Sequence, residues 1–210
     1  MEIYDLTHFI EEGMSAYSEE EKASIENLAS IKSDGYNVKK ISLSNHTGTH
    51  IDLPNHIFED GNRLEDISLE KFIGSAFVLD CRNIKQISME YILKNIDDIK
   101  KYNYIIFKTG AEKLWKKEEY LNGYSFLTEE AINFLGNIEE IYGIGVDCIS
   151  VDASFNHNLT NHKILLEKNK IIIENLCGLE NLTGEYEIII APLKIKEADG
   201  SPSRIFLIKK

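Results

Sequence analysis

The chain's densest group of chemically active side chains lies in the segment HTGTHIDLPNH, residues 46–56. Its three histidines and one aspartate all occupy even positions: His46, His50, Asp52 and His56. In an extended strand, even positions share one face, so these side chains would point to the same side. Neutral imidazole nitrogens and a carboxylate are ligands of zinc or manganese, and three ligands with an open position are typical of a catalytic metal site. The segment therefore predicts metal chemistry on one face of a strand.

The residues around this segment carry the complementary apolar face. Four apolar residues occupy odd positions: Ile41, Leu43, Ile51 and Leu53. This alternation predicts a strand over Asn37–Asp52, with a break at Pro54. A helix would also bring His46 and His50 together, at positions i and i+4. The β-branched residues and the glycine between them disfavour that helix, so the strand is preferred.

In this segment the chain resembles the cyclase-like metal-dependent hydrolases, a family that includes bacterial kynurenine formamidases and isatin hydrolases. The family motif HxGTHxDxPxH is matched at every specified position of residues 46–56. The similarity continues through HIFEDGNRLEDISLEKFIG, KTGAEKLW at 108–115, GIGVDCISVD at 143–152, and the closing GEYEIIIAPLKIKEADGSPSRIFLI. Because the resemblance covers nearly the whole chain, it implies the family's swivelling β/β/α fold.

A metal site built on one strand needs further ligands from elsewhere in the chain. From the residues alone, His157 in an Asn-rich turn and His162 on a predicted helix are both candidates. Glu174 ends the apolar run Ile171–Ile173, where a buried carboxylate would need a partner such as a cation. The resemblance favours His162, because family members carry a metal histidine twelve residues before a metal glutamate, the spacing of His162 and Glu174.

The resemblance also implies a role for each residue. It implies one or two divalent ions per chain, Zn²⁺ or Mn²⁺, held by His46, His50, Asp52, His162 and Glu174. The two carboxylates would be able to bridge both ions. His56 would be the proton donor and acceptor, since imidazole exchanges protons near neutral pH.

The reaction that follows from these parts is hydrolysis of an amide-type C–N bond. A metal ion lowers the pKa of a bound water to about 7 and polarises the carbonyl under attack. The resemblance implies an aryl formamide such as N-formylkynurenine as the substrate, with Tyr17 placed to stack on its ring. A cyclic amide or imide, as in isatin, is the alternative. A non-catalytic binding protein of the same fold is disfavoured, because the residue proposed for proton transfer is present along with every ligand.

Composition limits the other classes of function. With 210 residues and 43% hydrophobic content, the chain predicts one domain over residues 1–210. The formal charge of −12 argues against nucleic-acid binding, which needs a basic surface. No stretch approaches the ~20 apolar residues of a membrane span, and no signal peptide is recognisable, so we expect a cytoplasmic protein. The three cysteines are widely spaced and predict neither disulfides nor a thiolate zinc site. The resemblance implies a homodimer or a larger closed assembly.

The order of predicted elements indicates an α/β fold with one mixed sheet that curves around a core, and helices packed outside it. The predicted strands are Ile3–Leu6, Asn37–Asp52, Ala76–Asp80, Tyr104–Lys108, Ile141–Val146, Lys170–Glu174, Tyr186–Ala191 and Arg204–Ile208. The predicted helices are Glu19–Ser30, Ser88–Asn95, Glu112–Leu121, Thr128–Leu135 and Leu159–Lys168.

Overall fold

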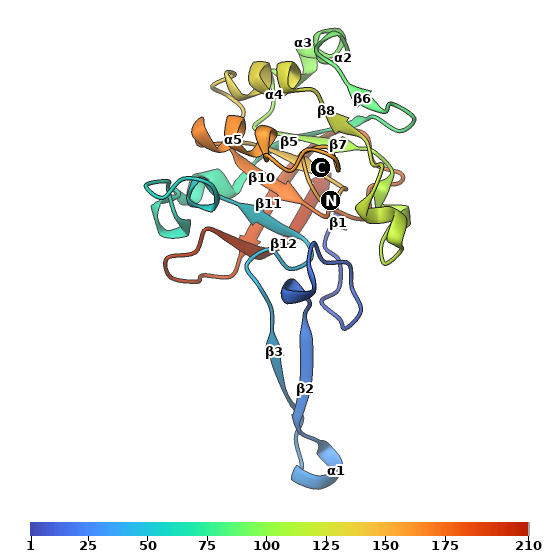
Figure 1. The fold of residues 1–210 in the computed structure, drawn as a ribbon, viewed down its shortest axis with the longest axis vertical. Coiled ribbons are helices and arrows are strands. Elements are labelled where there is room, and N and C mark those ends of the chain that lie inside the picture. The colour runs from blue at the N-terminus through green and yellow to red at the C-terminus, as the bar shows by residue number, and fades with distance from the viewer. Residues whose placement is uncertain (210) are drawn as a thin grey trace.

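A computed structural model describes residues 1–209, and an eight-stranded mixed sheet forms its centre (Figure 1). In sheet order, the strands are β1 (Glu2–Asp5), β12 (Gly200–Lys209), β11 (Gly184–Pro192), β5 (Ile73–Asp80), β7 (Tyr104–Lys108), β9 (Gly143–Val146), β10 (Ile171–Glu174) and β4 (His50–Asp52). The four strands from β5 to β10 are parallel, and the other pairings are antiparallel. Because β4 pairs with both β10 and β12, the sheet curves back on itself around that short strand.

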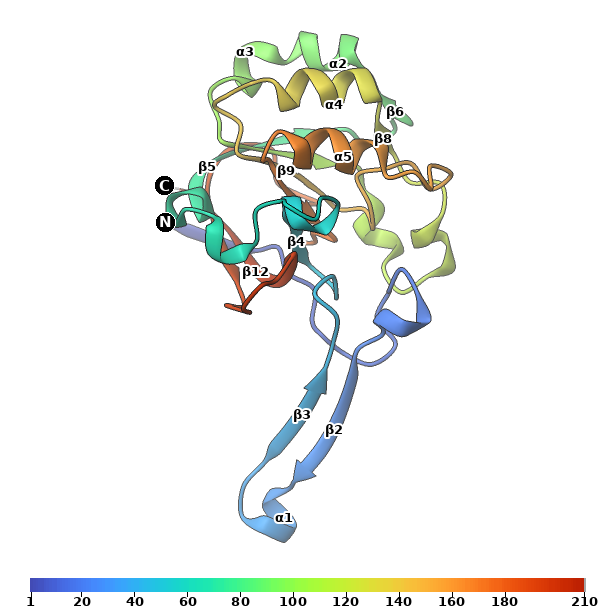
Figure 2. The ribbon, with the colours of Figure 1, turned by 60° about the vertical axis from the view of Figure 1, so that its left-hand side comes forward.

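Helices cover the outer face of the parallel strands (Figure 2). They are α2 (Met89–Lys94), α3 (Ile96–Ile99), α4 (Glu129–Gly136) and α5 (Thr160–Glu167). The hydroxyls of Ser88 and Thr128 cap α2 and α4 by accepting hydrogen bonds from backbone N–H groups. One buried apolar cluster fills the space between helices and sheet, and a second fills the inside of the curved sheet. Strands buried on both faces explain the nearly continuous apolar sequence of β7.

A narrow two-stranded ribbon projects from this body (Figures 1 and 2). It consists of β2 (Ser24–Ala29) and β3 (Val38–Ser42), which pair antiparallel, with the single-turn helix α1 (Ile31–Asp34) at its tip. Ser30 caps α1, and Gly35 ends it with a left-handed backbone at φ 81°. We call residues 22–44 the arm. A further short pair, β6 (Gln86–Ile87) and β8 (Phe126–Leu127), lies beside α2 and α4.

The predicted α/β fold with one mixed, curved sheet and outer helices is confirmed, but three local predictions are wrong. The predicted helix Glu19–Ser30 is one 3₁₀ turn at Glu19–Glu21 followed by β2, because pairing with β3 overrides its helical composition. The predicted strand Asn37–Asp52 is split into β3 and β4 by turns over residues 43–49. The predicted helix Glu112–Leu121 consists of two 3₁₀ turns separated by Lys116, whose φ of 66° no α-helix accepts.

None of the helices in residues 1–209 combines the length and the apolar character that a membrane crossing requires.

Candidate metal centre and active site

Strand β4 positions the first ligands of the candidate site. Ile51 points into the core and is fully buried, so its neighbours His50 and Asp52 point to the opposite side, as strand alternation requires. Glu174 on β10 is the registered partner of His50, which places both side chains at the same level of the sheet. His46 was predicted to lie on a continuous strand with His50 and Asp52. In the structure it lies in the turn before β4.

That turn depends on local hydrogen bonds and on one glycine. The Thr47 N–H donates to the Ser44 carbonyl, and the Ser44 N–H donates to the Thr47 hydroxyl at 2.9 Å. Gly48 follows with φ 66°, a left-handed conformation that favours glycine. The Gly48 carbonyl then accepts from His50 Nδ1 at 2.8 Å, which leaves His50 Nε2 to face the carboxylates.

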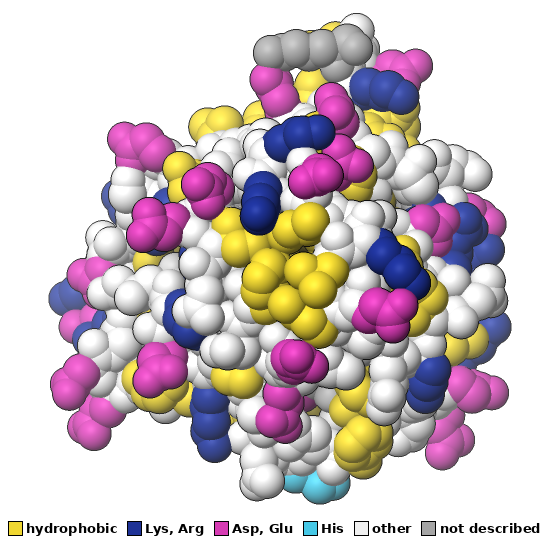
Figure 3. Space-filling model, turned by 90° about the horizontal axis from the view of Figure 1, so that it is seen from above, with side chains coloured by type: hydrophobic (Ala, Val, Ile, Leu, Met, Phe, Trp, Pro, Cys, Tyr) yellow, Lys and Arg dark blue, Asp and Glu magenta, His cyan; other side chains and the backbone are white. Residues whose placement is uncertain are grey.

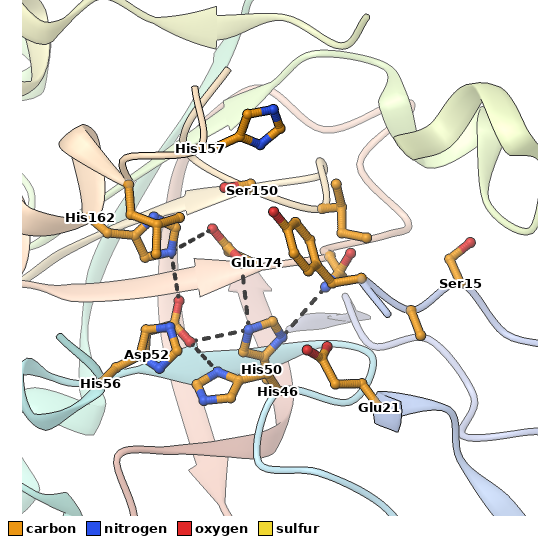
Figure 4. Close-up of a pocket in the computed structure, with 15 residues that line it drawn as sticks. Ser15, Glu21, His46, His50, Asp52, His56, Ser150, His157, His162 and Glu174 are labelled. Carbon is orange, nitrogen blue, oxygen red and sulfur yellow. Dashed lines mark hydrogen bonds and ion pairs between the residues drawn. The ribbon is translucent and has the colours of Figure 1, made fainter. Parts of the chain in front are cut away.

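Asp52 occupies the middle of the cluster (Figure 4). Its Oδ1 lies 2.7 Å from His46 Nδ1 and 3.2 Å from His50 Nε2. Its Oδ2 makes no hydrogen bond within residues 1–209 and faces His162 Nε2 at 3.4 Å. The carboxylate is 1% exposed, so water does not compensate for the missing partner. An unsatisfied buried oxygen between imidazoles is the arrangement that a bound cation would complete.

Glu174 closes the other side of the cluster. Its Oε1 lies 3.3 Å from His162 Nε2 and accepts from the Val151 N–H at 2.7 Å, and its Oε2 lies 3.7 Å from His50 Nε2. Burial raises the pKa of Glu174 to about 7, and the facing imidazoles only partly oppose this rise. The carboxylate at the end of β10 therefore faces the same buried space as Asp52.

The donor set fits divalent cations. Two sets with ligand atoms within 4.8 Å of one another share one carboxylate: His46, His50 and Asp52, and Asp52, His162 and Glu174. All five residues offer nitrogen or oxygen, the ligands of zinc and manganese sites that lack thiolate. Burial disfavours protonated His46, but hydrogen bonds to Asp199 and Asp52 outweigh it and raise the pKa of His46 to about 10. The carboxylates around His46 thus favour a positive charge within the cluster. A bound metal cation would supply such a charge.

Asp152 fixes the orientation of His162. Its Oδ2 accepts from His162 Nδ1 at 2.7 Å and from the His162 backbone N–H at 3.2 Å. Its Oδ1 accepts from the Asn161 N–H at 2.8 Å. With Nδ1 held in this way, Nε2 is the ring nitrogen available to a metal.

Asp152→Asn is expected to weaken metal binding without removing a ligand. Asparagine keeps the shape of the side chain but loses the charge that holds His162 Nδ1–H, and losses of this kind lower metal affinity by about 10- to 100-fold. Competition with a chelator on the folded protein measures the change, and Asp60→Asn at an exposed position is the control. Wild-type affinity in Asp152→Asn would contradict this orienting role.

Asp199 is a site residue that the sequence did not reveal. Its Oδ2 accepts from His46 Nε2 at 3.0 Å and from His56 Nδ1 at 3.1 Å. Hydrogen bonds from both histidines hold the pKa of the Asp199 carboxyl well below its usual range. Gly200 allows this approach, because a Cβ there would lie 2.8 Å from the ring of His46. The only signal in the sequence was the position of Asp199 within the closing stretch that resembles the family.

The side chains open onto a cavity of about 240 Å³. His56 lies in a 3₁₀ turn directly after β4, and its ring centre is 4.2 Å from that of His46. Tyr17, which is 63% exposed, lines the same cavity. His157 and His162, the two candidates for a distant metal ligand, both line this cavity. Only His162 points at the carboxylates, whereas His157 stands apart from them (Figure 4). All the predicted site residues therefore meet at one cavity.

Comparison with known proteins identifies the family. The family model described as "Putative cyclase" matches residues 4–153. The chain belongs to the cyclase family. Kynurenine formamidase of Bacillus cereus is 32% identical to this cyclase-family chain over 174 residues, which cover 82% of the chain and 80% of that protein. The resemblance predicted from the sequence is thereby confirmed.

Solved structures agree with this assignment. A predicted metal-dependent hydrolase from Bacillus stearothermophilus superposes with a TM-score of 0.83 at 27% identity, covering 98% of this chain and 97% of that one. Isatin hydrolase A from Labrenzia aggregata, bound to benzyl benzoate, gives 0.86 at 26% identity, covering 100% and 94%. These relatives support a cyclase-family hydrolase, and the histidine and carboxylate groups of this chain are suited to hold a metal.

Proposed function

We propose that this cyclase-family protein is a metal-dependent amidohydrolase, with an aryl formamide such as N-formylkynurenine as its substrate. The observation that carries the proposal is Asp52, a buried carboxylate with an unsatisfied oxygen, held between three imidazoles at the bottom of an open cavity. The 32% identity to a kynurenine formamidase, over most of both chains, supports this choice of substrate.

One or two ions, Zn²⁺ or Mn²⁺, would be held by His46, His50, Asp52, His162 and Glu174. When bound, such ions polarise the substrate carbonyl and activate water. The carboxylates of Asp52 and Glu174 hold the imidazoles in place. Because both carboxylates are buried, little solvent competes for the ligand atoms.

His56 is the proposed proton carrier. Asp199 accepts from its Nδ1, which fixes the tautomer and leaves Nε2 as the atom that takes or gives a proton. The side chain is 27% exposed and lines the cavity, so Nε2 can reach both substrate and solvent. From this position it protonates the leaving aryl nitrogen as the C–N bond breaks.

Tyr17 supplies an aromatic surface to the cavity, which the apolar side chains of Ile149 and Leu159 also line. An aryl ring between such surfaces gains stacking and apolar contact. A cyclic amide is the second candidate substrate, because isatin hydrolase A superposes over the whole chain.

A comparison of substrates tests the proposed function. Metal-loaded protein is assayed with N-formylkynurenine, isatin and a simple cyclic imide, and we expect the highest kcat/KM for N-formylkynurenine. Chelation should abolish turnover, and zinc or manganese should restore it. Faster turnover of isatin would replace the aryl formamide by the cyclic amide. A metal-loaded protein that turns over none of the three would contradict the proposal.

A further inference from the structure

A second cavity, of about 270 Å³, adjoins the cavity at the candidate metal centre. The two cavities share four lining residues, Tyr17, Ile149, Ser150 and Leu159. None of the five proposed metal ligands lines the second cavity. The second cavity is therefore too far from the ligands to take part in the reaction, but it can hold another part of the same substrate.

The wall between the two cavities is also where the aryl ring of the proposed substrate would lie. Tyr17, Ile149 and Leu159 supply the aromatic and apolar surface that such a ring would contact. Because these side chains line both cavities, a ring held by them has both cavities within reach of its substituents. With the formyl group at the metal ligands of the first cavity, a substituent on the neighbouring ring carbon can enter the second.

Uncharged polar side chains line this second cavity. Asn122 is exposed, and its side-chain amide makes no hydrogen bond within residues 1–209. The Ser154 hydroxyl accepts from the Gly123 N–H at 3.3 Å, which leaves its own proton free to donate. Asp152 is the only charged side chain among the lining residues, and its carboxylate already accepts from His162. A ligand in this cavity thus meets hydrogen-bonding groups and no free charge.

The charge of the two cavities indicates which substituent fits. Of the described residues that line them, none is Lys or Arg, whereas such side chains are interspersed with acidic ones on the face seen in Figure 3. A substituent with a lone carboxylate would lose water there without gaining an ion pair. A zwitterion has no net charge, and its ammonium and carboxylate groups can pair with the oxygen and the NH₂ of an amide and with a hydroxyl. The second cavity therefore favours an α-amino acid over a simple acid.

We propose that the second cavity is a subsite for a zwitterionic α-amino acid arm of the substrate, and that Asn122 and Ser154 determine this specificity. The proposal rests on the proposed hydrolysis of an aryl formamide, and it narrows the substrate to one that carries such an arm beside the formamide. N-formylkynurenine has this arm, on the ring carbon next to the formamido group, whereas isatin has none.

Three formamides with the same ring and the same scissile bond test the subsite on the metal-loaded full chain. They are N-formylkynurenine, the analogue that lacks only its α-amino group, and ortho-formamidoacetophenone, which lacks the whole amino acid arm. We expect kcat/KM to be highest for N-formylkynurenine and about 10- to 100-fold lower for each of the others, because one or two hydrogen bonds to charged groups are lost. Equal kcat/KM for the three would overturn the subsite and leave the hydrolysis itself standing.

Two variants of the second cavity change its chemistry in different ways. Asn122→Lys adds a cation that pairs with a carboxylate and repels an ammonium, so it should shift the preference by about 10-fold toward the analogue without the amino group. Ser154→Leu fills the cavity and should lower kcat/KM for N-formylkynurenine by about 10-fold, with a smaller effect on ortho-formamidoacetophenone, whose turnover also reports that the variant is folded. Asn133→Lys, at an exposed position of α4, is the matched control and should keep the wild-type preferences. Wild-type preferences in both cavity variants would contradict the subsite.

Calorimetry separates failure of the subsite from failure of the proposed function. Kynurenine and ortho-aminoacetophenone differ only in the amino acid arm, and neither has to be hydrolysed in order to bind. Kynurenine should bind the metal-loaded wild type at least ~10-fold more tightly, and Ser154→Leu should reduce this difference. A chain that hydrolyses none of the three formamides but prefers kynurenine in this way would refute the proposed reaction and support the subsite. Equal affinity for the two amines would overturn the subsite, whatever the turnover.

Discussion

Asp52→Asn is expected to lose bound metal and hydrolytic activity together. The carboxylate lies within 3.4 Å of three imidazoles and has one oxygen without a hydrogen bond. Asparagine removes the negative charge and turns one metal-facing oxygen into an NH₂ group, which cannot bind a cation. Asp52 belongs both to the set with His46 and His50 and to the set with His162 and Glu174, so its loss weakens the binding of an ion at either set. We therefore expect metal affinity to fall by more than ~100-fold. Elemental analysis after metal loading and dialysis, together with an amide hydrolysis assay, measures both effects.

The matched control is again Asp60→Asn, a change of the same type at an exposed position. It should keep the metal content and turnover of the wild type. Unchanged metal binding in Asp52→Asn would remove Asp52 from the ligands. A wild-type chain that stays free of metal in excess zinc or manganese would refute metal-dependent hydrolysis altogether.

The inner strands β7 and β10 of the central sheet were predictable because they are buried on both faces. The sequences YIIFK of β7 and IIIE of β10 are short, rich in β-branched residues and largely apolar. Such nearly continuous apolar runs are typical of strands covered on both faces. Strand β3 of the arm lies within the predicted strand Asn37–Asp52, but β2 was not predictable by the same argument, since none of its residues is buried. Without a core, the segment shows no alternating pattern, and its acidic start suggested a helix instead.

The site was predictable only where its residues are close in sequence or carry the family spacing. His50 and Asp52 share a strand face, and the resemblance supplied His162 and Glu174. Asp199 lies 153 residues from His46, and the pairing of β4 with β12 brings it to the site. A single aspartate before a glycine carries no local signal of such a contact. The same holds for Asp152, which reaches His162 through the fold rather than through a motif.

Loss of His56 is expected to slow proton transfer without removing the metal. His56→Ala should keep its metal, because the five proposed ligands remain, while turnover falls by about 10²- to 10⁴-fold, the range for losing a general acid or base. KM should change much less, since His56 acts on the leaving nitrogen rather than on the aryl ring. Elemental analysis and steady-state kinetics on the best amide substrate separate these effects. Asp199→Asn should lower kcat in the same direction but by less, because His56 keeps its imidazole and loses only the partner of Nδ1.

The outcome of His56→Ala distinguishes two arrangements that the geometry allows. His46, His56 and Asp199 also form a set with ligand atoms within 4.8 Å of one another. If His56 binds a metal through this set, the variant loses part of its metal, and the proton carrier must be another residue. If His56 carries the proton, metal content stays constant and added imidazole restores part of the turnover. A variant that keeps both its metal and full turnover would refute the proposed role of His56.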